Sequence, residues 1–245
     1  MNDQTLYLQC RPGDIAPLVL LTGDPSRVDR VMALLTDARK VSQNREFEVV
    51  TGRYSGSEVT IASGGIGAPS TAIAVHELEQ MGAQAIVRIG TMMGVGAPLE
   101  SVVLSTGSAR FEGTSARYLP REYPAIPDWR LTQALSAAGR LAHLDIQLGL
   151  TATFDAFYPD MAPVLTGNGA LDLTPYQNAG VLAMDMESAL LFSLGMVLKI
   201  ATAAMCIVTV QAEPHRHLDQ DRRAALDQRM VRAALDGIVA YGETL

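Results

Sequence analysis

The chain has 245 residues, of which 48% are hydrophobic and 18% are charged. This composition excludes an intrinsically disordered protein, and a chain of this length buries enough surface to fold without disulfides or metals. The formal net charge of −7 argues against a generic nucleic-acid-binding protein, although a few arginines can still converge on a small anion. The two cysteines, Cys10 and Cys206, have no paired spacing, so we expect free thiols in a reducing compartment.

The first residues of the chain lack the basic start and apolar core of a signal peptide. The most apolar stretch, residues 188–210, carries one charge at Lys199, and a lysine in the middle of a membrane span costs about 2.5–3.5 kcal/mol. This stretch fits better as a helix that ends near Gly195, followed by a buried strand over 200–210. We therefore expect a cytoplasmic protein that does not enter a membrane.

Short apolar runs and helical patterns alternate in the first part of the chain. Residues 18–21 predict a buried strand. A helix is expected next, with Asp24 as its N-cap and apolar positions that continue to Leu35. Residues 47–54 and 57–62 flank a Ser-Gly pair, which is the pattern of a β-hairpin.

Further along, the same alternation continues. Residues 69–81 predict a helix that stops at a glycine, and residues 83–89 predict a buried strand that ends at Gly90-Thr91. A second apolar helix is expected to start near Met184, before the strand over 200–210. From about Asp219 the spacing predicts an amphipathic helix that reaches the C-terminus.

Units of strand, glycine and helix build a mixed or parallel sheet with helices on both faces. We therefore expect a single α/β domain over residues 1–245, with a central mixed β-sheet flanked by helices on both faces. Ligands in such sheets collect at the carboxyl ends of the strands. The residues that follow each predicted strand are thus the candidates for chemistry.

Three arginines stand within or beside predicted strands. Gly23 and Arg27 bracket a predicted helix N-terminus, which can bind an anion or can be an ordinary capped turn with a surface arginine. Arg88 interrupts an apolar strand, so it either forms a structural salt bridge or serves an anion. Arg45 precedes a strand beside Glu46, and a surface ion pair is the simpler interpretation.

Other polar residues leave two interpretations open. Asp185 and Glu187 at a helix start can complement the helix dipole, or Glu187 can accept hydrogen bonds from ligand hydroxyls. The glycine-rich run 64–67 is a weak nucleotide signature. His215 and His217 lie in a polar loop, where solvated side chains are the simpler interpretation. The sequence shows no catalytic triad and no spacing of metal ligands.

In combination, these segments resemble the nucleoside phosphorylase family of uridine phosphorylase and the hexameric purine nucleoside phosphorylases, with the uridine phosphorylase branch most similar. Each segment is weak alone, but six occur in the same order over most of the chain. They are LTGDPSRV (21–28), REF (45–47), GGIGAPSTAIAV (64–75), RIGT (88–91), FDAFYP (154–159) and MES (186–188).

The resemblance implies a reaction in which phosphate attacks the anomeric carbon of a nucleoside and gives free base and ribose 1-phosphate. It implies that phosphate is held by Gly23, Arg27, Arg88 and Thr91, and by Arg45 from a neighbouring subunit. Inorganic phosphate is then a co-substrate, and no cofactor or metal is expected. The family forms homo-oligomers built from dimers, so we expect a homo-oligomer, most simply a hexamer, with sites shared between subunits.

For the sugar, the resemblance implies Met186, Glu187 and Tyr7, the last across a subunit boundary in place of a histidine. Glu187 would accept from the ribose hydroxyls and pair with Arg88, which makes these two residues the catalytic candidates. Phe157 would stack on or flank the base. The transition state is oxocarbenium-like, so an anion beneath the sugar stabilises it.

The base-binding half departs from the family pattern. Met161 and Pro163 occupy the places of the glutamine and arginine with which uridine phosphorylases read uracil, and neither side chain donates a hydrogen bond. Gln211 stands where the purine branch has an aspartate. Met161 and Gln211 remain the base-binding candidates, and Glu213, His215 or Arg216 could fold over the base instead.

The base, and the choice of ribose or deoxyribose, therefore stay open. One alternative is a hydrolase on the same fold that cleaves nucleosides with water, and the three arginines argue against it. The other alternative is a non-catalytic or altered-specificity nucleoside-binding protein. The departures from the family pattern in the base-binding half favour this alternative.

Overall fold

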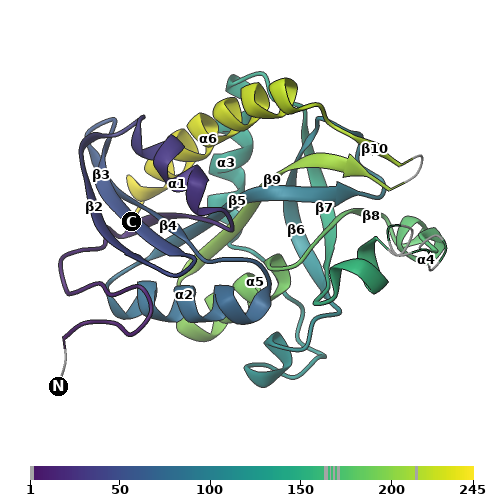
Figure 1. Cartoon of the computed structure of the whole chain (residues 1–245), viewed down its shortest axis with the longest axis horizontal. Helices are drawn as coiled ribbons and strands as arrows, with labels where there is room; N and C mark the ends of the chain where they lie inside the picture. The colour runs from purple at the N-terminus through teal and green to yellow at the C-terminus, as the bar shows by residue number, and fades with distance from the viewer. Residues whose placement is uncertain (1–2, 163–164, 166, 168, 170–171, 213–214) are drawn as a thin grey trace.

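The computed structural model describes residues 3–162, 165, 167, 169, 172–212 and 215–245 (Figure 1). Ten strands of the described chain form one sheet in the order β10-β9-β6-β7-β8-β5-β1-β4-β3-β2. The strands are β1 (Leu18–Thr22), β2 (Thr36–Asn44), β3 (Phe47–Tyr54), β4 (Ser57–Ser63), β5 (Ala85–Gly94), β6 (Val102–Arg110), β7 (Ile146–Thr153), β8 (Val181–Asp185), β9 (Ala201–Gln211) and β10 (Arg216–His217).

The sheet is mixed, as the sequence predicts. Strand β5 is parallel to β1 and β9 and antiparallel to β8, and the β5–β9 pairing closes β5, β8, β7, β6 and β9 into a ring. In the β1–β5 register, Leu21 lies beside Arg88 and Thr22 beside Ile89. The residues that follow β1 therefore lie next to the second half of β5.

Helices cover both faces of this sheet (Figure 1). The helices α1 (Pro25–Met32), α3 (Trp129–Leu141) and α6 (Gln220–Gly242) contribute to one buried cluster, and α2 (Ala68–Gln80) and α5 (Ser188–Leu198) contribute to another. A short helix, α4 (Thr174–Asn178), precedes β8. The predicted fold class, a single α/β domain with a mixed sheet between helices, is confirmed.

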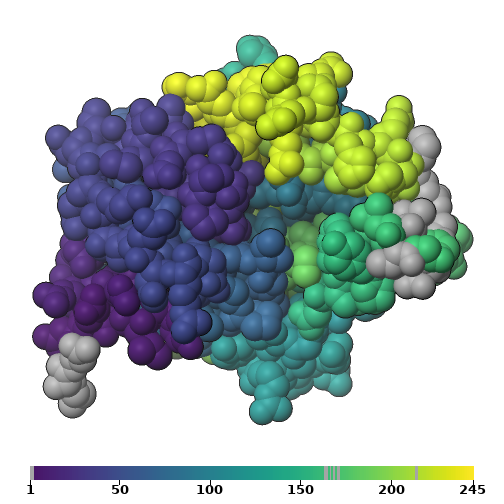
Figure 2. All heavy atoms as spheres, viewed as in Figure 1, coloured from purple at the N-terminus to yellow at the C-terminus, as the bar shows by residue number. Residues whose placement is uncertain are grey.

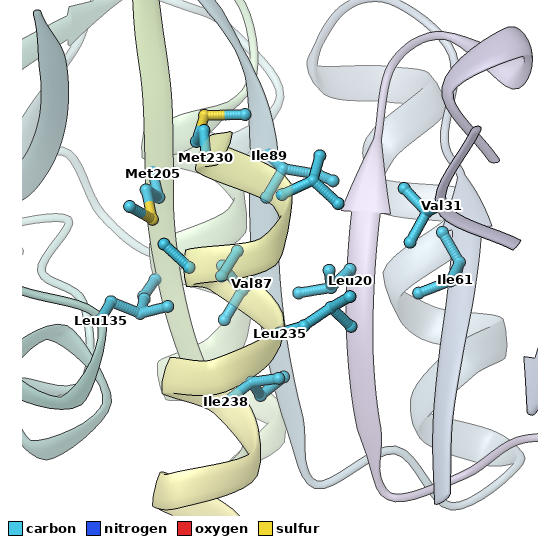
Figure 3. Close-up of a cluster of buried hydrophobic side chains, with 14 of the residues drawn as sticks. Leu20, Val31, Ile61, Val87, Ile89, Leu135, Met205, Met230, Leu235 and Ile238 are labelled. Atoms are coloured by element: carbon cyan, nitrogen blue, oxygen red, sulfur yellow. The ribbon is translucent and has the colours of Figure 1, made fainter. Parts of the chain in front are cut away.

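The C-terminal helix α6 shows how the sequence period becomes packing. Its side chains Met230, Leu235 and Ile238 are fully buried against the sheet, beside Val87 and Ile89 of β5 (Figure 3). Each such side chain contributes about 1.5–3 kcal/mol on burial. The predicted start is also confirmed, because the Asp219 carboxylate accepts a hydrogen bond from the Arg222 N–H at 2.9 Å.

Two predicted boundaries differ in the first half of the chain. Helix α1 ends at Met32 and not at Leu35, because Leu34 and Leu35 form a turn that leads into β2 while still packing against the core. Strand β5 does not end at Gly90-Thr91 but continues to Gly94, since these residues pair with Cys206 and Ile207 of β9. Thr91 therefore lies within a strand.

A third correction concerns the region before α5. Met184 and Asp185 do not open a helix; they belong to β8, where they pair with residues of β7 and Met184 also pairs with Met93 of β5. Helix α5 starts at Ser188, whose N–H donates to the Asp185 carboxylate at 3.1 Å. Met186 and Glu187 thus form the turn between strand and helix.

Within the described parts of the chain, we find no helix with the length and hydropathy that a membrane span requires.

Candidate active site

A cavity of about 700 Å³ lies where β1 and the second half of β5 adjoin the turn between β8 and α5. Figure 2 shows the molecular face where purple-blue, green and yellow segments meet, which are the segments that supply its walls. Eight of the predicted site residues line it: Gly23, Arg27, Arg88, Thr91, Phe157, Met161, Met186 and Glu187.

Arg88 of β5 lies at the buried end of this cavity and is held by carboxylates. Its Nη2 donates to Glu187, and Asp185 lies 3.6 Å from the same nitrogen. Burial by itself would lower the pKa of Arg88, but Cys206 and these two carboxylates raise it overall, so the guanidinium stays charged. The predicted Arg88–Glu187 pair is confirmed, and it explains how an arginine is tolerated inside an apolar strand.

The second oxygen of Glu187 connects the pair to the glycine-rich loop. Its Oε1 accepts a hydrogen bond from the Gly67 N–H at 2.7 Å, at the N-terminus of α2. A carboxylate at a helix N-terminus is favourable because the helix dipole and the unpaired N–H groups both attract negative charge. The loop thus holds a catalytic candidate through its backbone, and Gly67 has a φ of 91°, a conformation that glycine adopts without strain.

Arg27 is the second cation of the site, and it is buried rather than a surface arginine. Its Nε donates to Asp227 of α6 at 2.9 Å, and its Nη1 donates to Thr22 at 2.8 Å. The first turn of α1 is fixed in turn by Asp24, whose carboxylate accepts from the Ser26 N–H at 2.9 Å. Two arginines and a helix N-terminus therefore line one cavity, which is the chemistry of an anion site.

Three residues that support these arginines were missed from the sequence. A Cβ on Gly90 would lie 2.7 Å from Arg88 Nη1, so the absent side chain makes room for the guanidinium. The same nitrogen lies 2.7 Å from the Cys206 sulfur, and burial raises the pKa of this thiol to about 11, although Arg88 opposes the shift. Asp227 is the third. Of these three residues, only Gly90 could have been predicted from the local sequence, because it lies two residues after Arg88 in the same strand.

The opposite end of the cavity is apolar. Phe157 lies half-exposed in a turn, Phe157–Met161, and buried Met161 follows on the same wall. Pro163 lies outside the described residues. Four more methionines line the cavity, namely Met92, Met93, Met184 and Met186. Methionine adapts its shape to what it packs against, so this wall suits a flat apolar group.

The structure does not bring every predicted residue to this cavity. Gln211 is the last residue of β9, and its neighbour Val210 lines the cavity in its place among the described residues. Tyr7 and Arg45 lie together elsewhere on the surface, with the Arg45 guanidinium carbon 5.9 Å from the Tyr7 ring centroid. The order of residues along the chain does not show which of them line the cavity, because its wall is formed by strands that pair across the sheet.

Comparison with known proteins agrees with this geometry. Residues 17–240 match the family model described as Phosphorylase superfamily. The chain is 37% identical over 204 residues to guanosine phosphorylase of Halorubrum lacusprofundi, covering 82% of this chain and 81% of that protein. It is 34% identical over 243 residues to uridine phosphorylase of Treponema pallidum, covering 97% and 94% respectively.

A solved structure is similar over the same extent. It is uridine phosphorylase from Vibrio fischeri, with a TM-score of 0.85 and 27% identity, covering 96% of this chain and 95% of that one. The chain therefore belongs to the phosphorylase superfamily, as a pentosyltransferase of the nucleoside phosphorylase type.

Proposed function

We propose that the chain cleaves a nucleoside, of the uridine type or with another base, using inorganic phosphate and releasing ribose 1-phosphate. The observation that carries this proposal is the placement of Arg27 and the Arg88–Glu187 pair on one cavity. Phosphate would be held by both guanidinium groups, by Thr91 and by the backbone at Gly23, where a helix N-terminus favours an anion.

The ribose would lie over Met186 and Glu187. Among the residues that the structure describes, each oxygen of the Glu187 carboxylate has one hydrogen-bond donor, which leaves lone pairs for the sugar hydroxyls. As the bond from the anomeric carbon to the base breaks, positive charge grows on the sugar and the fixed anions stabilise it. Positioning phosphate against the anomeric carbon supplies much of the remaining acceleration. The base would lie against Phe157 and Met161.

The proposal includes a neighbouring subunit. Tyr7 and Arg45 lie side by side at the surface and away from their own cavity, so they are available to complete the phosphate and ribose site of another copy. We propose a homo-oligomer built from dimers, most simply a hexamer. The remaining parts of the proposal are a cytoplasmic enzyme of nucleoside salvage or catabolism that requires no cofactor or metal.

The test is base release from a panel of purine and pyrimidine nucleosides, each with and without phosphate. We expect release only with phosphate, matched mole for mole by ribose 1-phosphate. Equal release without phosphate would support the hydrolase instead. Folded protein that releases no base, but melts at a higher temperature with a nucleoside, would support the binding protein.

A further inference from the structure

Two histidines lie on the wall of the active-site cavity. His215 and His217 both line it, and their Nε2 atoms are 2.8 Å apart. The two rings meet edge to face, with centroids 4.6 Å apart. At this separation one imidazole donates its Nε2 proton and the other accepts it, so the two rings share a hydrogen bond.

Strand register selects these two side chains. In the β9–β10 pairing, His217 lies opposite Val210, which lines the cavity, and Arg216 lies opposite Gln211. Residues two apart in an extended chain share a face, so His215 and His217 point to the cavity side together. Neither Arg216 nor Gln211 is among the described residues that line it. The edge of the sheet therefore presents imidazoles to the ligand.

The hydrogen-bonding capacity of such a pair follows from its shared bond. In the neutral pair, one Nδ1 accepts and the other Nδ1–H donates. With one more proton, both Nδ1 atoms donate. A leaving base gathers negative charge on a ring nitrogen and on the carbonyl oxygen next to it, and either atom can accept from an Nδ1–H of the pair. Adenine presents an amino donor in place of that oxygen and matches less well.

The rest of the cavity does not offer an equivalent group at its apolar end, where Phe157, Met161, Ala162 and Leu165 form the described wall. Charged side chains also line the same cavity. They are Asp24 and Arg27 near α1, Arg88 of β5, Asp185, Glu187 and Arg223 of α6. Arg216 of the same strand faces away, and Glu213 lies outside the described residues.

We propose that His215 and His217 form the edge that recognises the base and that the pair protonates it as it leaves. The inference rests on the proposed phosphorolysis. A phosphate oxygen forms a bond to the anomeric carbon, the bond to the base breaks, and its electron pair passes to the base. The base takes one proton from the pair, which is replaced from solvent. The substrates are nucleosides whose base carries such an oxygen, namely 6-oxopurines and uracil, in preference to adenine.

The test compares His215→Gln and His217→Gln with Arg216→Gln, a control on the same strand that faces away. Substrates are inosine, uridine and adenosine, each with phosphate. Glutamine keeps a donor and an acceptor but cannot carry the proton, so we expect kcat for inosine or uridine to fall about 100-fold while KM changes little.

The phosphate KM and the melting temperature should stay at wild-type values, because in the described part of the chain the histidines bond to each other and Arg27 and Arg88 bond to other residues. Histidine variants that match Arg216→Gln would overturn the inference while the phosphorolysis stands. A parallel loss of kcat, phosphate affinity and melting temperature would also overturn it, since that pattern reports a structural role. Wild-type protein without any phosphate-dependent release would instead refute the proposed function itself.

Discussion

The two ends of the cavity are built differently. At the phosphate and ribose end, Arg27, Arg88 and Glu187 are buried and each is bonded to a protein partner. At the base end, methionines, a half-exposed Phe157 and the short edge strand β10 form the wall. Charged groups catalyse well only when their geometry is fixed before substrate binds, whereas a base is held mainly through its apolar faces.

The difference indicates how specificity can change within this fold. The charged end is an interlocked network, so one altered member disturbs the others. The apolar end has few mutual hydrogen bonds, so its side chains can be replaced one at a time. We therefore expect mutations at the first end to affect all nucleosides equally, and mutations at the second end to alter the ratio between bases.

The largest effect is expected for Glu187→Gln. The amide keeps the shape but removes the anion that faces the sugar and neutralises Arg88. We expect kcat/KM to fall about 1,000-fold for purine and pyrimidine nucleosides alike, as when a preorganised electrostatic group is lost. Steady-state kinetics on both classes measures this, with exposed Glu58→Gln as the control. A change in the ratio of kcat/KM between purine and pyrimidine nucleosides would contradict the proposed difference between the two ends of the cavity.

Gly90→Ala should come next. The new methyl group would meet the Arg88 guanidinium at 2.7 Å and displace it. A displacement near 1 Å can cost about 100-fold in rate, so we expect a loss of this size together with weaker phosphate binding. Gly107→Ala is the matched control in a strand, since its Cβ would meet its nearest neighbour at 3.5 Å. Equal kinetics for the two variants would refute this role of Gly90.

Asp227→Asn tests the support of Arg27 from the far end of the chain. The amide weakens the 2.9 Å bond that orients the guanidinium. We expect the phosphate KM to rise about 10-fold, in line with loss of 1–2 kcal/mol from a charge-assisted hydrogen bond, with the base ratio unchanged. Phosphate titrations with Asp221→Asn as a surface control on α6 measure it. An unchanged phosphate KM would show that Arg27 is oriented by Thr22 alone.

The smallest effect on turnover is expected for Met161→Ala. The truncated side chain removes one apolar wall, so we expect the nucleoside KM to rise several-fold and the base ratio to change. Because Met161 is buried, stability should fall by about 2 kcal/mol. Kinetics at saturating phosphate and chemical denaturation check the two effects. A change in the phosphate KM would contradict the proposal that Met161 acts only at the base end of the cavity.

The sequence alone determined much of the charged end. Gly23, Arg27, Arg88 and Glu187 each stand where a strand meets a turn or lie in a short local pattern. The cost of burying an arginine predicted a partner or an anion for Arg88, and the family resemblance named Glu187 as that partner. Likewise, helix α6 followed from its amphipathic period. These features depend on neighbours a few residues away, which a sequence displays directly.

Only the tertiary structure decided the rest. Strand β5 continues through Gly90-Thr91 because β9, more than a hundred residues later, pairs with it. Arg27 is buried against Asp227, 200 residues along the chain. Among the described residues, His217 lines the cavity and Gln211 does not, and this difference depends on the register of β10 against β9. Strand pairing and register arise from contacts between distant segments, and no local spacing encodes which partner a residue will meet.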